Sequence, residues 1–351
     1  MSEAVSDTRA SEMARASAKS DATTSHAGTR ISSSPRGPLK SGRRTPLWHS
    51  LVERLIAATS VAAILAIVLI FVFIAREALP LLWDHHGINL RDLIFPRQWT
   101  GYDSAVYVWQ PVGTPEKFNA MPLFLGSLKV TLLTMLWSVP IAIGAATFIS
   151  QYAPGRVRDI VKPAVEMLAG IPSVVLGFFA LMVLATWLQD AFGFHYRLNA
   201  VVSALALSLT VIPIVFTITE DALHAVPKSL REASLALGAR HWQTTLFIVL
   251  PAALPGIAAA VILGFGRAIG ETMVVLMASG NAAIMEPFNP ATSVRTVTAT
   301  VAAELGEVAQ GDTHWRVLFM LGVVLFLITF ALNRAGAQVI GRLHKKLTAA
   351  S

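Results

Sequence analysis

The sequence predicts an all-α integral membrane protein with six membrane-spanning helices. Of its 351 residues, 54% are hydrophobic and 14% are charged, whereas an average soluble domain has about 25% charged residues. Six segments are long and apolar enough to cross a hydrocarbon core of about 30 Å, which takes roughly 20 helical residues. Basic residues are concentrated in the loops on one side of these segments. Together these observations favour a membrane bundle.

The chain begins with a polar segment. Residues 1–48 are rich in Ser, Thr, Ala, Arg and Lys and bury too little apolar surface to offset the entropy of ordering. We expect a disordered, basic, cytoplasmic tail. A cleaved secretory signal fits poorly, because the first apolar run starts only near Leu55.

The six predicted spans follow. Residues 49–122 hold the first span and a long external segment, residues 123–333 form the transmembrane core, and residues 334–351 form a cytoplasmic C-terminal tail. Gly and Pro inside the spans are tolerated, because neighbouring helices satisfy the backbone groups that they free. The predicted spans are 55–74, 123–149, 164–188, 200–219, 255–278 and 317–332.

Loop charges predict the orientation. With both termini inside, 19 of the 28 Lys and Arg lie on the cytoplasmic side, 7 lie on the other side and 2 lie within spans. Cytoplasmic loops of membrane proteins carry such an excess of basic residues. The net charge of +7 is therefore explained by orientation, and we expect no nucleic-acid partner.

Several kinds of chemistry are excluded or not indicated. The chain has no Cys, which excludes disulfides and a thiolate nucleophile. His224 and His241 are too far apart for a metal pair on one helix face, and we expect no metal site. No G-x-x-x-x-G-K-[ST] phosphate loop is present. We therefore expect a non-catalytic chain that binds no cofactor itself.

Two external stretches offer possible docking surfaces. Residues 75–122 contain five Trp and Tyr side chains suited to the membrane interface, and residues 279–316 include Glu304, Glu307 and a short helix predicted near residues 293–308. Within the spans, Pro172 should kink or break the third. Lys129, near the start of the second, should direct its amine to an interface.

A cytoplasmic loop between the fourth and fifth spans predicts a short amphipathic helix. Ser229 and Glu232 have the spacing of a capping box, and Gly238 is a plausible C-terminal stop. Spacing alone leaves open whether this helix lies on lipid or contacts a partner.

The fifth span contains Arg267 and Glu271. Each ionisable group costs roughly 2.5 to 3.5 kcal/mol at the bilayer centre, so both should face protein or a water-filled path. Four residues apart, they share one helix face and can pair. They either neutralise each other or serve a passing ion, and a guanidinium suits an oxyanion because its planar fork donates two parallel hydrogen bonds.

The cytoplasmic loop resembles the EAA signature of ABC importer permeases. The resemblance implies a type I permease bundle in which this loop forms a coupling helix that docks into an ATPase dimer. ATP would then be used by that partner. The residues at the signature positions are Glu232, Ala233, Ser234, Gly238, Ile248, Leu250 and Pro251, with Ser234 where a second Ala is usual.

The runs GRAIGETM and IPSVVLGFF resemble segments of phosphate-specific permeases of the PstC type. This resemblance implies a subunit of a phosphate importer in the bacterial inner membrane. Its expected partners are a second homologous permease, an extracytoplasmic phosphate-binding protein and inorganic phosphate, which would pass Arg267 and Glu271. Three alternatives stay open: a sulfate or molybdate permease, an ion-coupled secondary transporter, and a membrane sensor without transport.

Overall fold

The computed structural model describes residues 47–83, 91–99 and 101–349, so most of the predicted N-terminal tail lies outside the described residues. The chain divides into two units, which meet between Ile64 and Leu65. The described part of the first unit is the N-terminal part of helix α2 (Leu47–Ala78), and the second unit contains the rest of α2 and all other elements.

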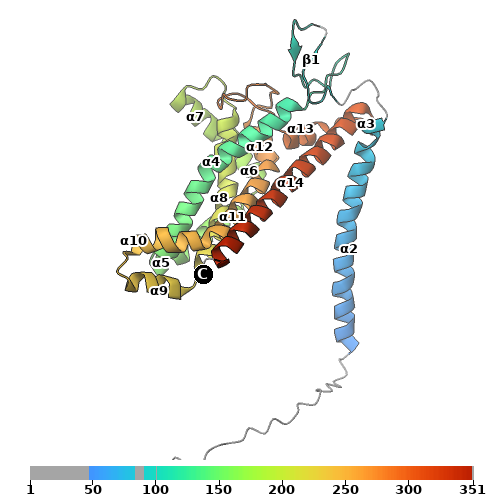
Figure 1. The fold of residues 1–351 in the computed structure, drawn as a ribbon. Coiled ribbons are helices and arrows are strands. Elements are labelled where there is room, and N and C mark those ends of the chain that lie inside the picture. The colour runs from blue at the N-terminus through green and yellow to red at the C-terminus, as the bar shows by residue number, and fades with distance from the viewer. Residues whose placement is uncertain (1–46, 84–90, 100, 350–351) are drawn as a thin grey trace, which may run out of the picture. The chain divides into compact units, whose positions relative to one another are not determined.

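The second unit is mostly helical, with long non-helical connections before α4 and between α12 and α13 (Figure 1). Its one described sheet is a two-stranded antiparallel pair between α3 and α4, in which Arg97 pairs with Val106. The remaining elements are α3 (Pro80–Trp83), β1 (Arg97–Gln98), β2 (Ala105–Val106), α4 (Met121–Gln151), α5 (Gly155–Ala169), α6 (Ser173–Phe179), η1 (Ala180–Leu184), α7 (Ala185–Phe192), α8 (Ala200–His224), α9 (Lys228–Ala236), α10 (His241–Thr244), η2 (Thr245–Val249), α11 (Leu250–Ile269), α12 (Met273–Ala278), α13 (Val297–Glu304) and α14 (Thr313–Ala349).

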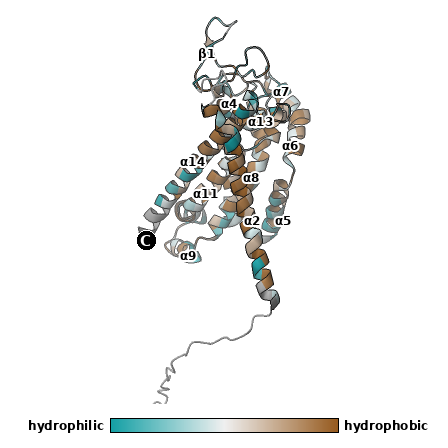
Figure 2. Ribbon diagram, turned by 90° about the vertical axis from the view of Figure 1, so that its right-hand side faces the viewer, coloured by the Kyte–Doolittle hydropathy of each residue, from teal (hydrophilic) through white to brown (hydrophobic). Residues whose placement is uncertain are grey.

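Six helical stretches in the described residues are long and apolar enough to cross a membrane, which confirms the predicted number of spans. Figure 2 shows mostly hydrophobic residues along α2 and hydrophilic residues on α5, which is not one of the spans. The spans are Leu51–Trp83, Met121–Gln151, Ser173–Phe192, Ala200–His224, His241–Ile269 and Thr313–Arg342.

The third span begins later than predicted. Residues 164–169, which we placed in this span, belong to the separate helix α5, and a turn at Gly170–Pro172 precedes α6. Pro172 has no amide hydrogen to donate and its φ is fixed, so it starts a new helix as its N-cap instead of continuing α5. The predicted break at Pro172 is therefore confirmed, and the predicted start of the span was wrong.

The last span ends later than predicted. We expected it to end at Leu332, but the apolar stretch runs to Arg342 and helix α14 continues to Ala349, through most of the predicted tail. The residues after Leu332 are more polar, but they include no Pro and only widely spaced Gly to break the helix.

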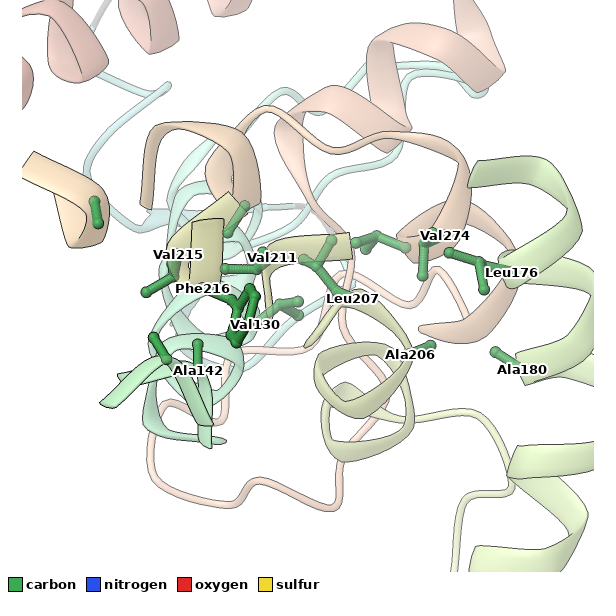
Figure 3. Packing of buried hydrophobic residues seen from close by; sticks show 14 of the residues in the cluster. Val130, Ala142, Leu176, Ala180, Ala206, Leu207, Val211, Val215, Phe216 and Val274 are labelled. Carbon is green, nitrogen blue, oxygen red and sulfur yellow. The ribbon is translucent and has the colours of Figure 1, made fainter. Parts of the chain in front are cut away.

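The core of the bundle lies around α8. Leu207, Val211 and Val215 of α8 are fully buried, and Figure 3 shows them among side chains of α4, α6 and α12. Glycines bring α11 close to α8: a Cβ added at Gly264 would lie 2.7 Å from Cγ2 of Val215, and one at Gly256 would lie 2.4 Å from Cβ of Ala222. Small residues of this kind let membrane helices approach closely.

Candidate functional site

Arg267 and Glu271 lie at a break in the fifth span. Helix α11 ends at Ile269 and α12 begins at Met273, so Glu271 lies just beyond the end of α11. Nη2 of Arg267 is 3.7 Å from Oε2 of Glu271, which confirms the pairing. Our expectation of one continuous helix was wrong, because the chain makes a tight turn at Gly270. The carbonyl of Glu271, left without a helical partner, accepts a hydrogen bond of 2.8 Å from Oγ1 of Thr298 in α13.

The two charged groups differ in exposure. The side chain of Glu271 is 5% exposed, whereas that of Arg267 is 53% exposed in the single chain. A guanidinium that is half exposed at a membrane span must face water or another protein, because the cost of exposing it to lipid is high. In this pair the guanidinium of Arg267 is therefore the exposed group and the carboxylate of Glu271 is the buried one.

Arg267 lines a cavity of about 640 Å³ between α11 and α14. A second cavity of about 740 Å³ lies beside it and is lined by hydroxyl-bearing side chains from the break and from α13, Thr272 and Thr298. Gly322 and Leu325 of α14 border both cavities. The break in the fifth span thus lies between two neighbouring hollows along one face of α14.

The predicted cytoplasmic helix is α9 (Lys228–Ala236). Gly238 has a φ of +86°, a conformation that favours glycine, and it follows the end of the helix as predicted. The predicted capping box was wrong. Pro227 is the N-cap residue and makes no side-chain cap, so Ser229 lies inside the helix. Proline in this position sets the φ that starts the helix and leaves no role for Ser229 as a cap.

The surface of α9 is open. Glu232 and Ala233 are exposed, and so are the apolar side chains Leu230, Leu235 and Leu237. Exposed apolar side chains close together on a short helix are typical of a protein or lipid contact.

Two hydrogen bonds connect α9 to the membrane helices. Nη2 of Arg231 donates to the backbone oxygen of Leu223 in α8 at 2.7 Å. The hydroxyls of Ser234 and Thr244 lie 3.0 Å apart and join α9 to α10, at the start of the fifth span. Helix α9 is therefore bonded both to the end of the fourth span and to the start of the fifth.

Sequence reasoning missed a buried carboxylate, Glu220, in the last turn of α8. Its side chain is 1% exposed, and it accepts hydrogen bonds from Nη2 of Arg158 at 2.8 Å and from Nζ of Lys162 at 2.7 Å, both on α5. Nδ1 of His224 lies 3.3 Å from the same carboxylate. The hydrogen bond to Glu220 raises the pKa of Lys162 above its usual value. The sequence signal was available: an acidic residue at the end of a predicted span, on the same predicted side as the basic loop 150–163.

Lys129 does not point to the interface alone. Its amine donates to the backbone oxygens of Glu286 and Asn289, the latter at 2.8 Å, and to Oγ1 of Thr292 at 3.1 Å. It thereby ties α4 to the loop between α12 and α13.

A third polar cluster surrounds Glu304, at the end of α13. Glu304 accepts hydrogen bonds from Nε1 of Trp109 at 3.1 Å and from Arg295, and Nε2 of His314 is 2.8 Å from its other oxygen. Trp109 and Phe118 also pack against the ring of His314. These contacts join the segment before α4 to α13 and α14.

Comparisons with known proteins agree with this architecture. A family described as "Binding-protein-dependent transport system inner membrane component" matches residues 138–344. The chain is 35% identical over 222 residues to the probable ABC transporter permease protein YqgH of Bacillus subtilis, which covers 63% of this chain and 72% of that protein. It is 34% identical over 259 residues to the phosphate transport system permease protein PstC of Mesorhizobium japonicum, which covers 68% and 77%.

The fold is also similar to a solved structure. A chain of a bacterial ABC transporter involved in the import of the acidic polysaccharide alginate aligns with a TM-score of 0.57 at 14% identity, covering 85% of this chain and 99% of that chain. At this identity the likeness concerns the fold alone.

Proposed function

Because this chain belongs to the family of binding-protein-dependent transport system inner membrane components, we propose that it is the permease subunit through which an ATP-driven importer carries phosphate across the inner membrane. Relatives at 29–34% identity bear the name phosphate transport system permease protein PstC. The chain itself is non-catalytic in this proposal, binds no cofactor, and has both termini in the cytoplasm.

The observation that carries the proposal is the half-exposed guanidinium of Arg267 beside a cavity within an apolar span. A fixed positive charge lowers the barrier for an anion that crosses a low-dielectric region. The nearby carboxylate of Glu271 reduces the net attraction, which suits transport because the anion must leave as well as enter. Binding of phosphate by the guanidinium fork is the step that this geometry supports.

The exposure of Arg267 also supports a second permease as a partner. In the single chain the cavity beside Arg267 is open, and a homologous subunit facing it would shield the pathway from lipid. An extracytoplasmic phosphate-binding protein would deliver phosphate at the external side, where Glu304 orders the surface.

The ATPase dimer would bind at α9. The exposed apolar side chains of α9 offer the contact area, and the bond from Arg231 to Leu223 offers a direct route from α9 to α8. Closure of the ATPase subunits on ATP would then displace α9 and, with it, the fourth and fifth spans.

Uptake by the reconstituted complex tests the proposal. The chain is co-expressed with its ATPase and second permease, purified and placed in proteoliposomes with ATP inside and the binding protein outside. We expect phosphate uptake that requires ATP and is insensitive to a protonophore. Arg267→Ala should reduce uptake about 100-fold, since a charged hydrogen-bond pair contributes about 1.5–3 kcal/mol, and Arg267→Lys should retain part of it.

Other outcomes would change the assignment. Uptake of labelled sulfate or molybdate that excess phosphate does not reduce would identify another oxyanion as substrate. Uptake that collapses with the proton gradient and persists without ATP would identify a secondary transporter. An Arg267→Ala complex that assembles and transports phosphate at the wild-type rate would remove the proposed role of this residue.

A further inference from the structure

Helix α14 carries a polar side chain to which no role has been assigned, Asn333. It lines the same cavity as Arg267, together with four other residues of α14. Their spacing of three or four residues places them on one face of the helix. These residues are Gly322, Leu325, Phe326 and Thr329.

The amide of Asn333 lies beside α11, next to Gly266. A Cβ added at Gly266 would be 3.6 Å from Oδ1 and 3.7 Å from Nδ2 of Asn333. Gly266 directly precedes Arg267, and both line the cavity. The neutral amide, on α14, and the guanidinium, on α11, therefore border the same cavity.

The amide of Asn333 has no hydrogen-bond partner among the described residues, and its side chain is exposed to the cavity. Placing an unpaired amide in hydrocarbon costs several kcal/mol of free energy, roughly as much as an unsatisfied backbone group costs in a bilayer. Asn333 must therefore face water, a partner subunit or a substrate.

Thr329, one turn earlier on the same face, differs from Asn333. Its hydroxyl already donates to the backbone oxygens of Leu325 and Phe326, each at 2.9 Å. A fully ionised oxyanion oxygen needs donors, and Thr329 has used its hydrogen, whereas both amide hydrogens of Asn333 are free for a ligand.

We propose that α14 forms the second wall of the phosphate pathway and that Asn333, which borders the same cavity as Arg267, donates a hydrogen bond to the passing anion. The inference rests on the proposed function. A neutral donor adds a directed contact without adding charge, so it stabilises phosphate beside Arg267 and still permits release.

Two near-isosteric variants test this in the reconstituted complex. Asn333→Leu removes the donor, and Asn333→Asp replaces it with a carboxylate that repels an anion. A hydrogen bond to a charged group contributes about 1.5–3 kcal/mol, so we expect Asn333→Leu to lower kcat/KM for phosphate about 10-fold or more, and Asn333→Asp to lower it further. If Asn333 only filled space, the closer isostere Asp would retain more activity than Leu, and that order would overturn the inference.

Thiol labelling gives a readout that does not depend on transport. The chain has no Cys, so Asn333→Cys introduces the only thiol in this subunit. In inverted vesicles without nucleotide, an anionic thiosulfonate should label Cys at 333, and millimolar inorganic phosphate should slow that labelling several-fold. The control is Leu327→Cys, on a residue 56% exposed that lines neither cavity, where no labelling or protection is expected.

The outcomes separate the two ideas. Labelling at 333 that phosphate does not slow, or a wild-type kcat/KM in Asn333→Leu, overturns the role of Asn333 while leaving the transporter assignment intact. A wild-type complex that takes up no phosphate contradicts the proposed function itself.

Discussion

Glu220→Gln is the substitution that most directly perturbs the connection between α5 and the end of α8. The carboxylate is buried, accepts hydrogen bonds from Arg158 and Lys162, and lies a few residues before the chain enters α9. Glutamine keeps the shape of the side chain and one acceptor oxygen, but it replaces the second oxygen by an NH2 group that faces a cation. One charge-assisted hydrogen bond and the negative charge are lost.

The magnitude follows from the contacts. A hydrogen bond to a charged group contributes about 1.5–3 kcal/mol. Removing one partner of a fully buried ion pair costs about 3–5 kcal/mol. Here the cation side chains are 37% and 30% exposed and stay partly hydrated after the substitution. We therefore expect a loss of about 2 kcal/mol, which shifts the equilibrium between attached and detached α5 about 30-fold.

Two measurements on the purified complex check this prediction. Glu220→Gln should lower the thermal unfolding temperature and should raise the number of ATP molecules hydrolysed per phosphate transported, because α8 transmits the displacement of α9 less completely. The matched control is Asp221→Asn: Asp221 is the next residue, its side chain is 66% exposed, and its oxygen is 3.5 Å from Lys162. If Glu220→Gln behaved like Asp221→Asn in both measurements, the reasoning would be refuted.

Three further predictions concern other parts of the second unit. Lys129→Met should raise amide hydrogen exchange in residues 282–292 about 10-fold or more, since it removes three hydrogen bonds to that loop; unchanged exchange would contradict this. Gly264→Ala should destabilise the protein by about 1–3 kcal/mol through its 2.7 Å contact with α8, whereas Gly144→Ala, where an added Cβ meets nothing within 4 Å, should be neutral or stabilising by up to about 1 kcal/mol; equal unfolding temperatures would count against the packing argument. Hydrogen bonding to Glu220 raises the pKa of Lys162 above 10.5, so the contribution of Lys162 to stability is complete below about pH 10.5 and is lost as the pH rises through the folded-state pKa. The difference in unfolding temperature between wild type and Lys162→Met should therefore be constant from about pH 7 to about pH 9. A difference that disappears in that range would contradict this prediction.

The number of spans could be predicted from the sequence because bilayer thickness fixes how long an apolar helix must be. The breaks were harder to place. Pro172 marked one break by its missing amide hydrogen, and the structure has a turn there. Nothing comparable marked the turn at Gly270, because glycine in membrane helices is as often a packing residue as a helix end. Local hydropathy has the same value for a glycine that packs against another helix and for a glycine that ends a helix.

Some site residues could be predicted from the sequence and others could not, for a similar reason. Arg267 was found because a charged residue inside an apolar run is conspicuous. Glu220 and Asn333 were missed for one shared reason: each directly follows the last residue of a predicted span, since the predicted spans ended at Thr219 and Leu332. Where the helix continues, as α8 and α14 do, such a residue can still face the interior. Contacts with other helices decide this, and hydropathy does not record them.

The contacts of α8 and α11 indicate where movement in the bundle can be absorbed. The close approaches at Gly256 and Gly264 leave little room for α11 to slide against α8, and close-packed interiors transmit displacement. A displacement of α9, acting through Arg231 on the end of α8, should therefore carry α11 along as one body. The chain can yield at the turn beyond α11, where helical hydrogen bonding is interrupted between Ile269 and Met273. Arg267 lies on the moving side of this turn and Glu271 within it, so the separation of the two charges should change with the state of the transporter, and with it the attraction that Arg267 offers an anion.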